Sequence, residues 1–295
     1  MNRRDFLLTT LAAPIAAAAP QQKLLIVHAD DAGMCHSVNA ATIEALANGS
    51  VSSASIMMPC PWVLEMAEWA RAHKDMDLGL HLTLTSEWKY YRWRPVAPPD
   101  KVKGLLDPEG YMWHNEVETA RHATAEEIEI EIRAQIERAR QFGIAFTHLD
   151  THMGTVYTRP DYFDVYARLA KEAGVPCMIP RPSEELRARK TPITEDMILA
   201  KEKAGHILID WLNTGVSGRT PPERRESYRK FIDSLRPGVT KLIIHLAKDD
   251  PEIRSVTGAW EPRWGDFLFW TSPDAKEWLA AAGVRLFTYR ELARP

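Results

Sequence analysis

The sequence predicts an α/β fold, a single distorted (β/α) barrel of the TIM type with about seven parallel strands. Segments of strand length alternate with segments in which apolar residues recur at helical spacing, and such repeats favour parallel strands joined by right-handed crossovers. No linker-like change of composition divides residues 21–295, so we expect one domain rather than two. No GxGxxG turn follows the first strand, which argues against an open, doubly wound sheet.

Residues 1–20 have the layout of an export leader rather than of a fold element. Arg3 and Arg4 precede an apolar stretch that ends in the small residues Ala16–Ala19, as in twin-arginine signal peptides. This pattern predicts an exported, periplasmic protein. The apolar run is shorter than the ~20 residues of a membrane span and no Cys follows it, so we expect no stable membrane anchor.

The composition excludes several classes of protein. The 295 residues include 37 Lys and Arg against 40 Asp and Glu, a net charge of -3, so there is no basic excess for neutralising the phosphates of a nucleic acid. The three cysteines match no CxxC pattern, and a chain of this length needs no disulfide to fold. A soluble globular protein that binds no nucleic acid is the expectation.

The first half of the domain is expected to open with three strand segments and two helices. Apolar runs of strand length, the third alternating leucines with polar residues, predict strands at 24–29, 51–58 and 78–85. Helical spacing of apolar residues predicts helices at 37–47 and 62–72. Residues 86–123 contain four prolines and no regular period, which is typical of a functional loop. Thr124 is the expected cap of a long charged helix to about residue 142, because Glu126 and Glu127 favour its positive end.

The second half is expected to repeat the pattern. Short apolar runs predict strands at 146–150, 175–180, 204–211, 239–245 and 285–288. Helices are predicted at 162–173, 222–235 and 273–282, followed by a closing helical turn. The first of these helices ends at a glycine and the other two begin at a proline, which are common signals at helix ends.

Acidic and histidine side chains gather where the predicted strands end. The strings HADDAG, GLHLTLT, THLDTH and KLIIH supply His28, Asp30, Asp31, His81, His148, Asp150, His152 and His245. Strand ends of a parallel barrel meet at one face, so we expect these side chains to converge. One carboxylate with two imidazoles makes a three-ligand set for a divalent metal with an open water position, as in catalytic sites. A remaining Asp and His can then serve as base and acid.

These strings, in this order, resemble the YdjC-like carbohydrate deacetylase family, which includes chitooligosaccharide deacetylases and is similar to polysaccharide deacetylases. The resemblance is strongest from about residue 23 to 157 and continues more loosely through Arg181 and KLIIH. It implies a distorted barrel, a divalent metal, and removal of N-acetyl groups from amino-sugar oligosaccharides or glycoconjugates. The chain departs from the family pattern at His28 and Ala32, after His152, and after His245.

Carried over by position, the resemblance makes Asp31, His81 and His152 the metal ligands. It likewise makes Asp30 the general base and His245 the candidate general acid. The softness of two imidazoles favours zinc, whereas magnesium, assigned to some family members, prefers oxygen ligands.

The aromatic residues of the long loop are candidates for substrate binding. Trp88 and Trp93 follow the strand that carries His81, and indole faces suit the apolar faces of sugar rings. Arg181 is a further substrate-binding candidate from the looser part of the match. The alternative interpretation is that these aromatics pin the loop to the barrel or cover the contact of a homodimer.

Two other functions stay open at this point. A glycoside hydrolase on the same barrel would use two carboxylates, with Asp30 and Asp150 as the pair. A catalytically silent carbohydrate-binding protein would keep the barrel without turnover.

Overall fold

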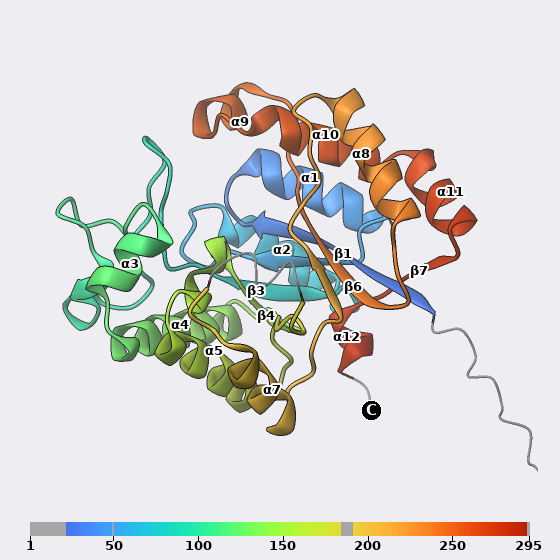
Figure 1. Cartoon of the computed structure of the whole chain (residues 1–295). Coiled ribbons are helices and arrows are strands. Elements are labelled where there is room, and N and C mark those ends of the chain that lie inside the picture. The colour runs from blue at the N-terminus through green and yellow to red at the C-terminus, as the bar shows by residue number, and fades with distance from the viewer. Residues whose placement is uncertain (1–21, 49, 184–190, 294–295) are drawn as a thin grey trace, which may run out of the picture.

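The computed structural model describes residues 22–48, 50–183 and 191–293 (Figure 1). Its core is a seven-stranded parallel sheet in the order β4-β3-β2-β1-β6-β5, with β7 paired to β1. The strands are β1 (Lys23–Ala32), β2 (Ser53–Ile56), β3 (Leu78–Leu82), β4 (Leu149–Thr151), β5 (Trp211–Asn213), β6 (Gly238–His245) and β7 (Val284–Leu286). The curled sheet with helices outside it confirms the predicted distorted barrel. The predicted leader, residues 1–20, lies outside the described residues.

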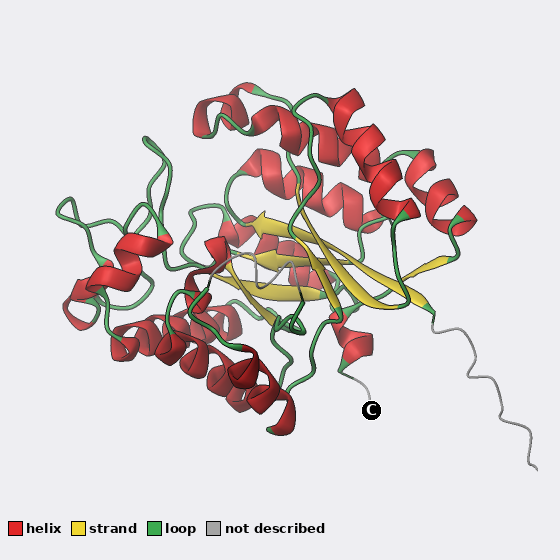
Figure 2. Ribbon diagram, in the orientation of Figure 1, coloured by secondary structure: helices red, strands yellow, loops and turns green. Residues whose placement is uncertain are grey.

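Helices cover the sheet in two groups (Figures 1 and 2). One group consists of α1 (His36–Ala47), α8 (Pro221–Asp233), α9 (Pro251–Val256), α10 (Trp260–Trp270) and α11 (Pro273–Ala281). The other consists of α3 (Glu116–His122), α4 (Ala125–Gln141), α5 (Pro160–Ala173) and α7 (Glu195–Lys203). The short helices α2 (Val63–Ala72) and α12 (Tyr289–Leu292) complete the set within the described ranges. Among those helices, none has the length and apolar character that crossing a bilayer requires.

Strand β1 is the centre of the sheet. Its last eight residues are all buried, because β6 pairs along one edge while β7 and β2 share the other. A strand enclosed in this way is apolar almost throughout, so the polar residues near its end are conspicuous.

The barrel closes between β4 and β5 without a continuous strand. Among the described residues, only isolated bridges join the segments there, from Leu149 to Cys177 and from Pro180 to Ile209. The strand predicted at 175–180 is therefore wrong in extent, since the prolines at 176, 180 and 182 lack the N–H groups that a ladder needs. The strand predicted at 204–211 is also wrong: α7 ends just before it, and regular pairing begins only at Trp211.

Several helix signals behave as predicted, but α3, α7, α9 and α10 were not predicted. Thr124 and Glu127 form a capping box at the start of α4, which satisfies N–H groups of its first turn. Helix α10 was not predicted, because Pro262 and Gly265 interrupt its apolar pattern. Pro262 lies in the first turn, where the missing N–H removes no helical hydrogen bond.

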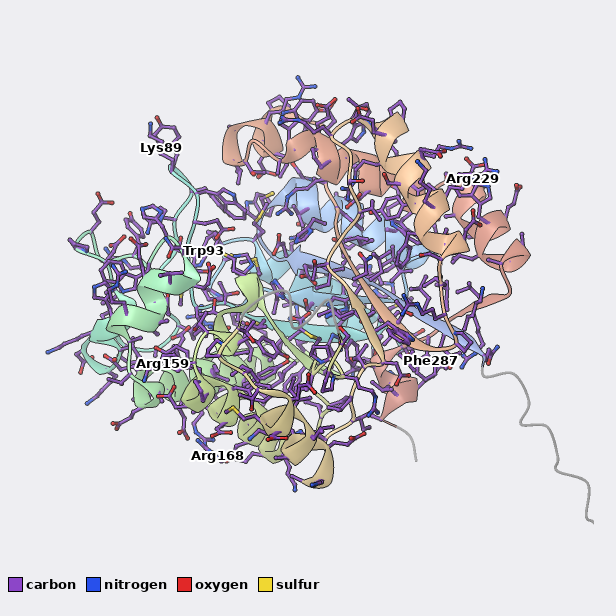
Figure 3. All side chains as sticks on the ribbon, in the orientation of Figure 1. Lys89, Trp93, Arg159, Arg168, Arg229 and Phe287 are labelled. Carbon is purple, nitrogen blue, oxygen red and sulfur yellow. The ribbon has the colours of Figure 1, made fainter. Side chains whose placement is uncertain are left out.

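The long loop, hereafter the aromatic segment (residues 86–123), contains the short helical turns η1 (Pro99–Lys101) and η2 (Lys103–Leu105) as well as α3. Buried Glu131 of α4 accepts hydrogen bonds from the N–H groups of Val96 (2.9 Å) and Ala97 (2.8 Å). Figure 3 shows Lys89 at the outer tip of the segment and Trp93 at its base. The barrel thus holds the base of this segment in place.

Candidate metal and catalytic site

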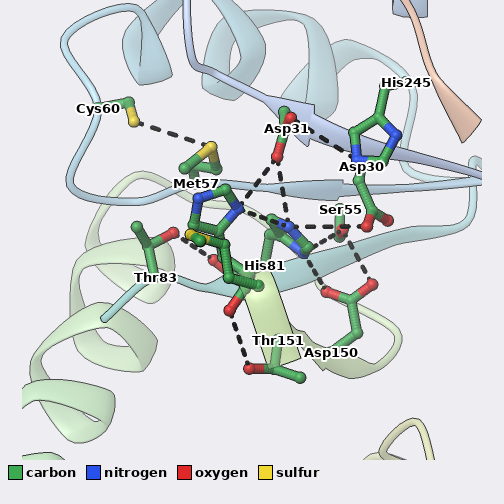
Figure 4. A network of polar contacts seen from close by, with 12 residues as sticks. Asp30, Asp31, Ser55, Met57, Cys60, His81, Thr83, Asp150, Thr151 and His245 are labelled. Atoms are coloured by element: carbon green, nitrogen blue, oxygen red, sulfur yellow. Dashed lines mark hydrogen bonds and ion pairs between the residues drawn. The ribbon is translucent and has the colours of Figure 1, made fainter. Parts of the chain in front are cut away.

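The strand ends bring the predicted site residues together (Figure 4). Asp30 and Asp31 lie near the end of β1, His81 lies in β3, and His245 ends β6 as the register partner of Asp30. His152 directly follows β4, whose Asp150 is the register partner of His81. Parallel strands therefore deliver three carboxylates and three imidazoles to one end of the barrel.

Asp31, His81 and His152 form a triangle of potential ligand atoms. Asp31 Oδ1 lies 3.4 Å from His81 Nε2 and 3.3 Å from His152 Nδ1, and the two ring nitrogens are 3.3 Å apart. A tetrahedral ion with bonds of about 2.0–2.2 Å separates its ligand atoms by about 3.4 Å. Asp31 Oδ1 is buried and has no hydrogen-bond partner among the described residues. The three side chains thus fit one small divalent cation.

The outer polar atom of each of these three side chains has a charged partner. His81 Nδ1 donates to Asp150 Oδ1 (2.7 Å), and His152 Nε2 donates to Glu87 Oε2 (3.0 Å). Arg263 Nη2 donates to Asp31 Oδ2 (2.6 Å). Partners of this kind fix ring orientation and tautomer at metal sites.

A neighbouring buried cluster is filled by an ammonium group instead. His28, His148 and Asp150 also lie within ligand distance of one another, but Lys241 Nζ is 2.9 Å from Asp150 Oδ2. Lys241 is fully buried, so its charge occupies the place that a second cation would need. Asp150 is itself only 1% exposed and bonded to Lys241, which removes it as the partner of Asp30 in a glycosidase pair.

Burial and neighbouring charges shift the acid–base groups in different directions. Burial raises the pKa of Asp30 to about 7, with His81 opposing and Asp150 adding to the shift. Burial also disfavours the charge on Asp31, yet Arg263 and the two histidines hold the pKa of that carboxyl well below its usual range. Adjacent carboxylates in the sequence therefore have different proton affinities, as expected for a base beside a ligand.

The histidines differ from one another as well. Burial opposes a charge on His152, but Glu87 and Asp31 outweigh it and raise the pKa to about 9. Burial and the nearby charge of Arg263 lower the pKa of His245, although Asp31 acts in the opposite direction. The His245 side chain remains 39% exposed, so a substrate can reach it.

A cavity of about 440 Å³ opens beside Asp30 and His245. Its other lining residues are mostly apolar or hydroxylated and include Thr151, Met153, Tyr157, Met178, Leu212, Thr214 and Ile243. Glu116 of α3 also lines it, so the aromatic segment reaches the cavity. A pocket with an apolar wall and a few converging polar groups is typical of small-molecule binding.

The three predicted substrate-binding residues lie outside this lining. Trp93 is only 3% exposed and donates its indole N–H to the carbonyl of Thr85, so it packs inside the segment. Trp88 is half-buried against Trp93. Arg181 forms ion pairs with Glu202 and Asp210 and lines a different cavity, beside the start of β6.

Sequence reasoning missed Glu87, Lys241 and Arg263. Lys241 directly precedes the apolar residues Leu242, Ile243 and Ile244 of the same predicted strand, a signal that could have been noticed. Glu87 and Arg263 carry no such signal, because each lies far along the chain from the ligand that it contacts.

The comparisons agree with the motifs. The family model for YdjC-like proteins matches residues 24–281. A carbohydrate deacetylase of Thermus thermophilus is 33% identical over 260 residues, covering 88% of this chain and 90% of the relative. A chitooligosaccharide deacetylase of Yersinia enterocolitica is 28% identical, covering 92% and 99%.

A solved structure has the same fold. It is described as a cellobiose-phosphate cleavage protein of Enterococcus faecalis and is 25% identical, with a TM-score of 0.79, covering 92% of this chain and all of the other. Because the family model spans nearly the whole described domain and includes every strand end of the site, this chain belongs to the YdjC-like family.

Proposed function

We propose that this protein is a metal-dependent hydrolase that removes N-acetyl groups from amino-sugar oligosaccharides or glycoconjugates. The observation that carries the proposal is the buried Asp31–His81–His152 triangle beside Asp30 and His245 at an open cavity. Relatives named carbohydrate deacetylase, similar over most of both chains, support the same chemistry.

Asp31, His81 and His152 would hold one divalent ion, zinc in preference to magnesium because two of the three ligands are imidazoles. When bound, such an ion polarises the acetyl carbonyl and makes a water molecule more acidic. Acidic neighbours of the two histidines favour a cation there: Asp30 and Asp150 lie within 3.7 Å of His81, and Glu87 lies 3.0 Å from His152.

Asp30 is the proposed general base. Its Oδ1 atom is buried without a hydrogen-bond partner among the described residues, and the carboxyl lines the cavity. A pKa of about 7 suits a group that must both accept and release a proton near neutral pH. Asp30 therefore accepts the proton of the attacking water molecule in the proposed reaction.

His245 is the proposed group that protonates the departing amine nitrogen as the carbon–nitrogen bond breaks. The proton that it delivers must reach it from within the site. Asp30 stands opposite it on the neighbouring strand and is the available source. One proton of the water molecule thus leaves with the amine. The hydroxyl group of the water joins the acyl carbon, and the acetic acid that forms loses its proton to give acetate as the second product.

The cavity wall supports a sugar substrate. Met153, Tyr157 and Ile243 offer apolar surface to the acetyl methyl group and to a pyranose face, while the hydroxyls of Thr151 and Thr214 lie beside them. Trp88, at the edge of the aromatic segment, remains the candidate for contacts with further sugar units of an oligomer.

The test combines metal analysis with substrate screening. Protein purified without chelators should contain about one equivalent of a divalent metal and release acetate from N-acetylated amino-sugar oligomers. Exhaustive chelation should abolish release, and added zinc should restore it. Full activity after chelation would contradict metal dependence, and sugar binding without acetate release from any substrate would indicate the silent binding protein instead.

A further inference from the structure

The aromatic segment contributes one of the three charged partners of the proposed metal ligands. Asp150 lies in β4 and Arg263 lies in α10, and both elements belong to the barrel framework. Glu87, in contrast, is the second residue of the aromatic segment, and its carboxylate reaches back to His152. The Glu87 side chain therefore joins a proposed metal ligand to the segment next to the cavity.

The orientation of the His152 ring depends on this contact. Nδ1 faces inward, 3.3 Å from both Asp31 Oδ1 and His81 Nε2, while Nε2 lies 3.0 Å from Glu87 Oε2. An ionised carboxylate only accepts hydrogen bonds, so it selects the tautomer with the proton on Nε2. In the metal-bound protein, where the proton on Nδ1 would be displaced, the lone pair of Nδ1 would then point into the triangle.

Glu87 is itself held by its neighbours in the segment. Trp93 donates its backbone N–H to Ser86 Oγ (3.0 Å) and its indole N–H to the carbonyl of Thr85 (2.9 Å). The N–H of Ser86 donates to the carbonyl of Trp113 (2.7 Å). The Trp93 ring also meets the His152 ring edge-on, with centroids 6.4 Å apart. The backbone that leads into Glu87 is thereby held by Trp93 and Trp113.

We propose that Glu87 is a positioning residue for His152, through which the aromatic segment sets the affinity of the site for its metal. This inference rests on the proposed function, since it requires the triangle to bind an ion. Glu87 need not touch the ion or the substrate. It holds the ring in place, fixes the tautomer, and makes the imidazole a better electron-pair donor by accepting its N–H.

The test measures metal affinity in the full chain. Zn²⁺ and Co²⁺ are titrated into metal-free wild type, Glu87→Ala and Glu87→Gln, with heat and Co²⁺ absorption as readouts. The Glu87→Ala variant should raise the dissociation constant about 10- to 100-fold, the usual effect of losing such a partner. The Glu87→Gln variant should fall between, because its amide oxygen can still accept from Nε2 without the negative charge.

A matched control lies in the same segment. Glu109 is exposed, so Glu109→Ala removes the same charge without touching the site and should leave both the affinity and the Co²⁺ spectrum unchanged. Thermal melts of the metal-free proteins report on folding. If Glu87→Ala is destabilised, the metal affinity of Glu87→Gln alone tests the proposal, since glutamine preserves the shape of the side chain.

Two negative results have different meanings. If the wild-type chain and the Glu87→Ala and Glu87→Gln variants all bind Zn²⁺ equally well, the proposed role of Glu87 is wrong but the metal site stands. A folded wild-type chain that binds neither Zn²⁺ nor Co²⁺ overturns the metal site of the proposed function, and this inference with it.

Discussion

Among the described residues, Lys241 is the only lysine or arginine that forms an ion pair with Asp150, and replacing it by methionine removes this positive charge. Lys241 Nζ is 2.9 Å from Asp150 Oδ2, and the two side chains are 0% and 2% exposed. Methionine has a similar length, so the change deletes the charge with little change in packing. Within the described part of the chain, the buried carboxylate of Asp150 would then keep hydrogen bonds only from Ser55, His28 and His81.

Breaking a buried ion pair by removing one partner costs about 3–5 kcal/mol. Because Asp150 keeps its other hydrogen-bond donors, we expect Lys241→Met to lower the free energy of unfolding by about 3 kcal/mol, the lower end of this range. At roughly 2–4 °C per kcal/mol for a domain of this size, the melting temperature should fall by roughly 6–12 °C.

This loss should depend on pH through His28. Burial, with Lys241 adding to the effect, lowers the pKa of His28 to about 4 in the folded protein, below its ordinary value of 6.5. Without Lys241, the folded-state pKa of His28 rises and a protonated His28 can replace the lost charge. A raised folded-state pKa stabilises at low pH, and this gain disappears as pH rises through that pKa. The penalty of Lys241→Met should therefore be largest above pH 7 and smaller at pH 5.

The assay is chemical unfolding of metal-free wild type and Lys241→Met at pH 5 and pH 8. Lys248→Met is the control, because Lys248 pairs with Glu44 at the surface and should contribute at most about 1 kcal/mol. A loss below about 1 kcal/mol for Lys241→Met, or the same loss at both pH values, would refute the reasoning.

Three further predictions concern the site. His81→Ala and His152→Ala should each lose bound metal while staying folded, and unchanged metal content in both, measured by elemental analysis, would contradict the ligand set. Asp30→Asn should keep the metal and lose turnover, whereas Asp31→Asn should weaken metal binding itself; in wild type, kcat/KM should fall below about pH 7 as Asp30 becomes protonated. Trp88→Ala should raise KM for oligomers more than for a monosaccharide, and equal effects on both would leave Trp88 a packing residue.

The barrel and the convergence of Asp and His could be predicted because both depend on local patterns. An apolar run such as 24–29 identifies a buried strand, and parallel strands bring their carboxyl ends together without further information. The capping box at Thr124 likewise depends on residues three apart. Errors concentrate at 175–180 and 204–211, where apolar residues line the closure of the barrel without forming a regular ladder.

The charged partners of the ligands could not be predicted in this way. Arg263 contacts Asp31 from the other end of the chain, and Glu87 meets His152 across two different strand ends. Which charge faces which ligand is decided by how the elements pack in three dimensions. No periodicity or short motif within the sequence indicates these contacts.

The pairing of β1 has a consequence for the order in which the protein acquires its structure. Lys23 pairs with both Gly238 and Val284, so the first strand of the domain is completed by strands made near the end of synthesis. Contacts between such distant positions form slowly, because a long loop must close before any stabilisation is gained. The edge of β1 that pairs with β6 therefore remains unpaired until nearly the whole chain has been synthesised. Truncation close to the C-terminus should consequently damage a site whose proposed ligands, Asp31, His81 and His152, all lie far from that end of the chain.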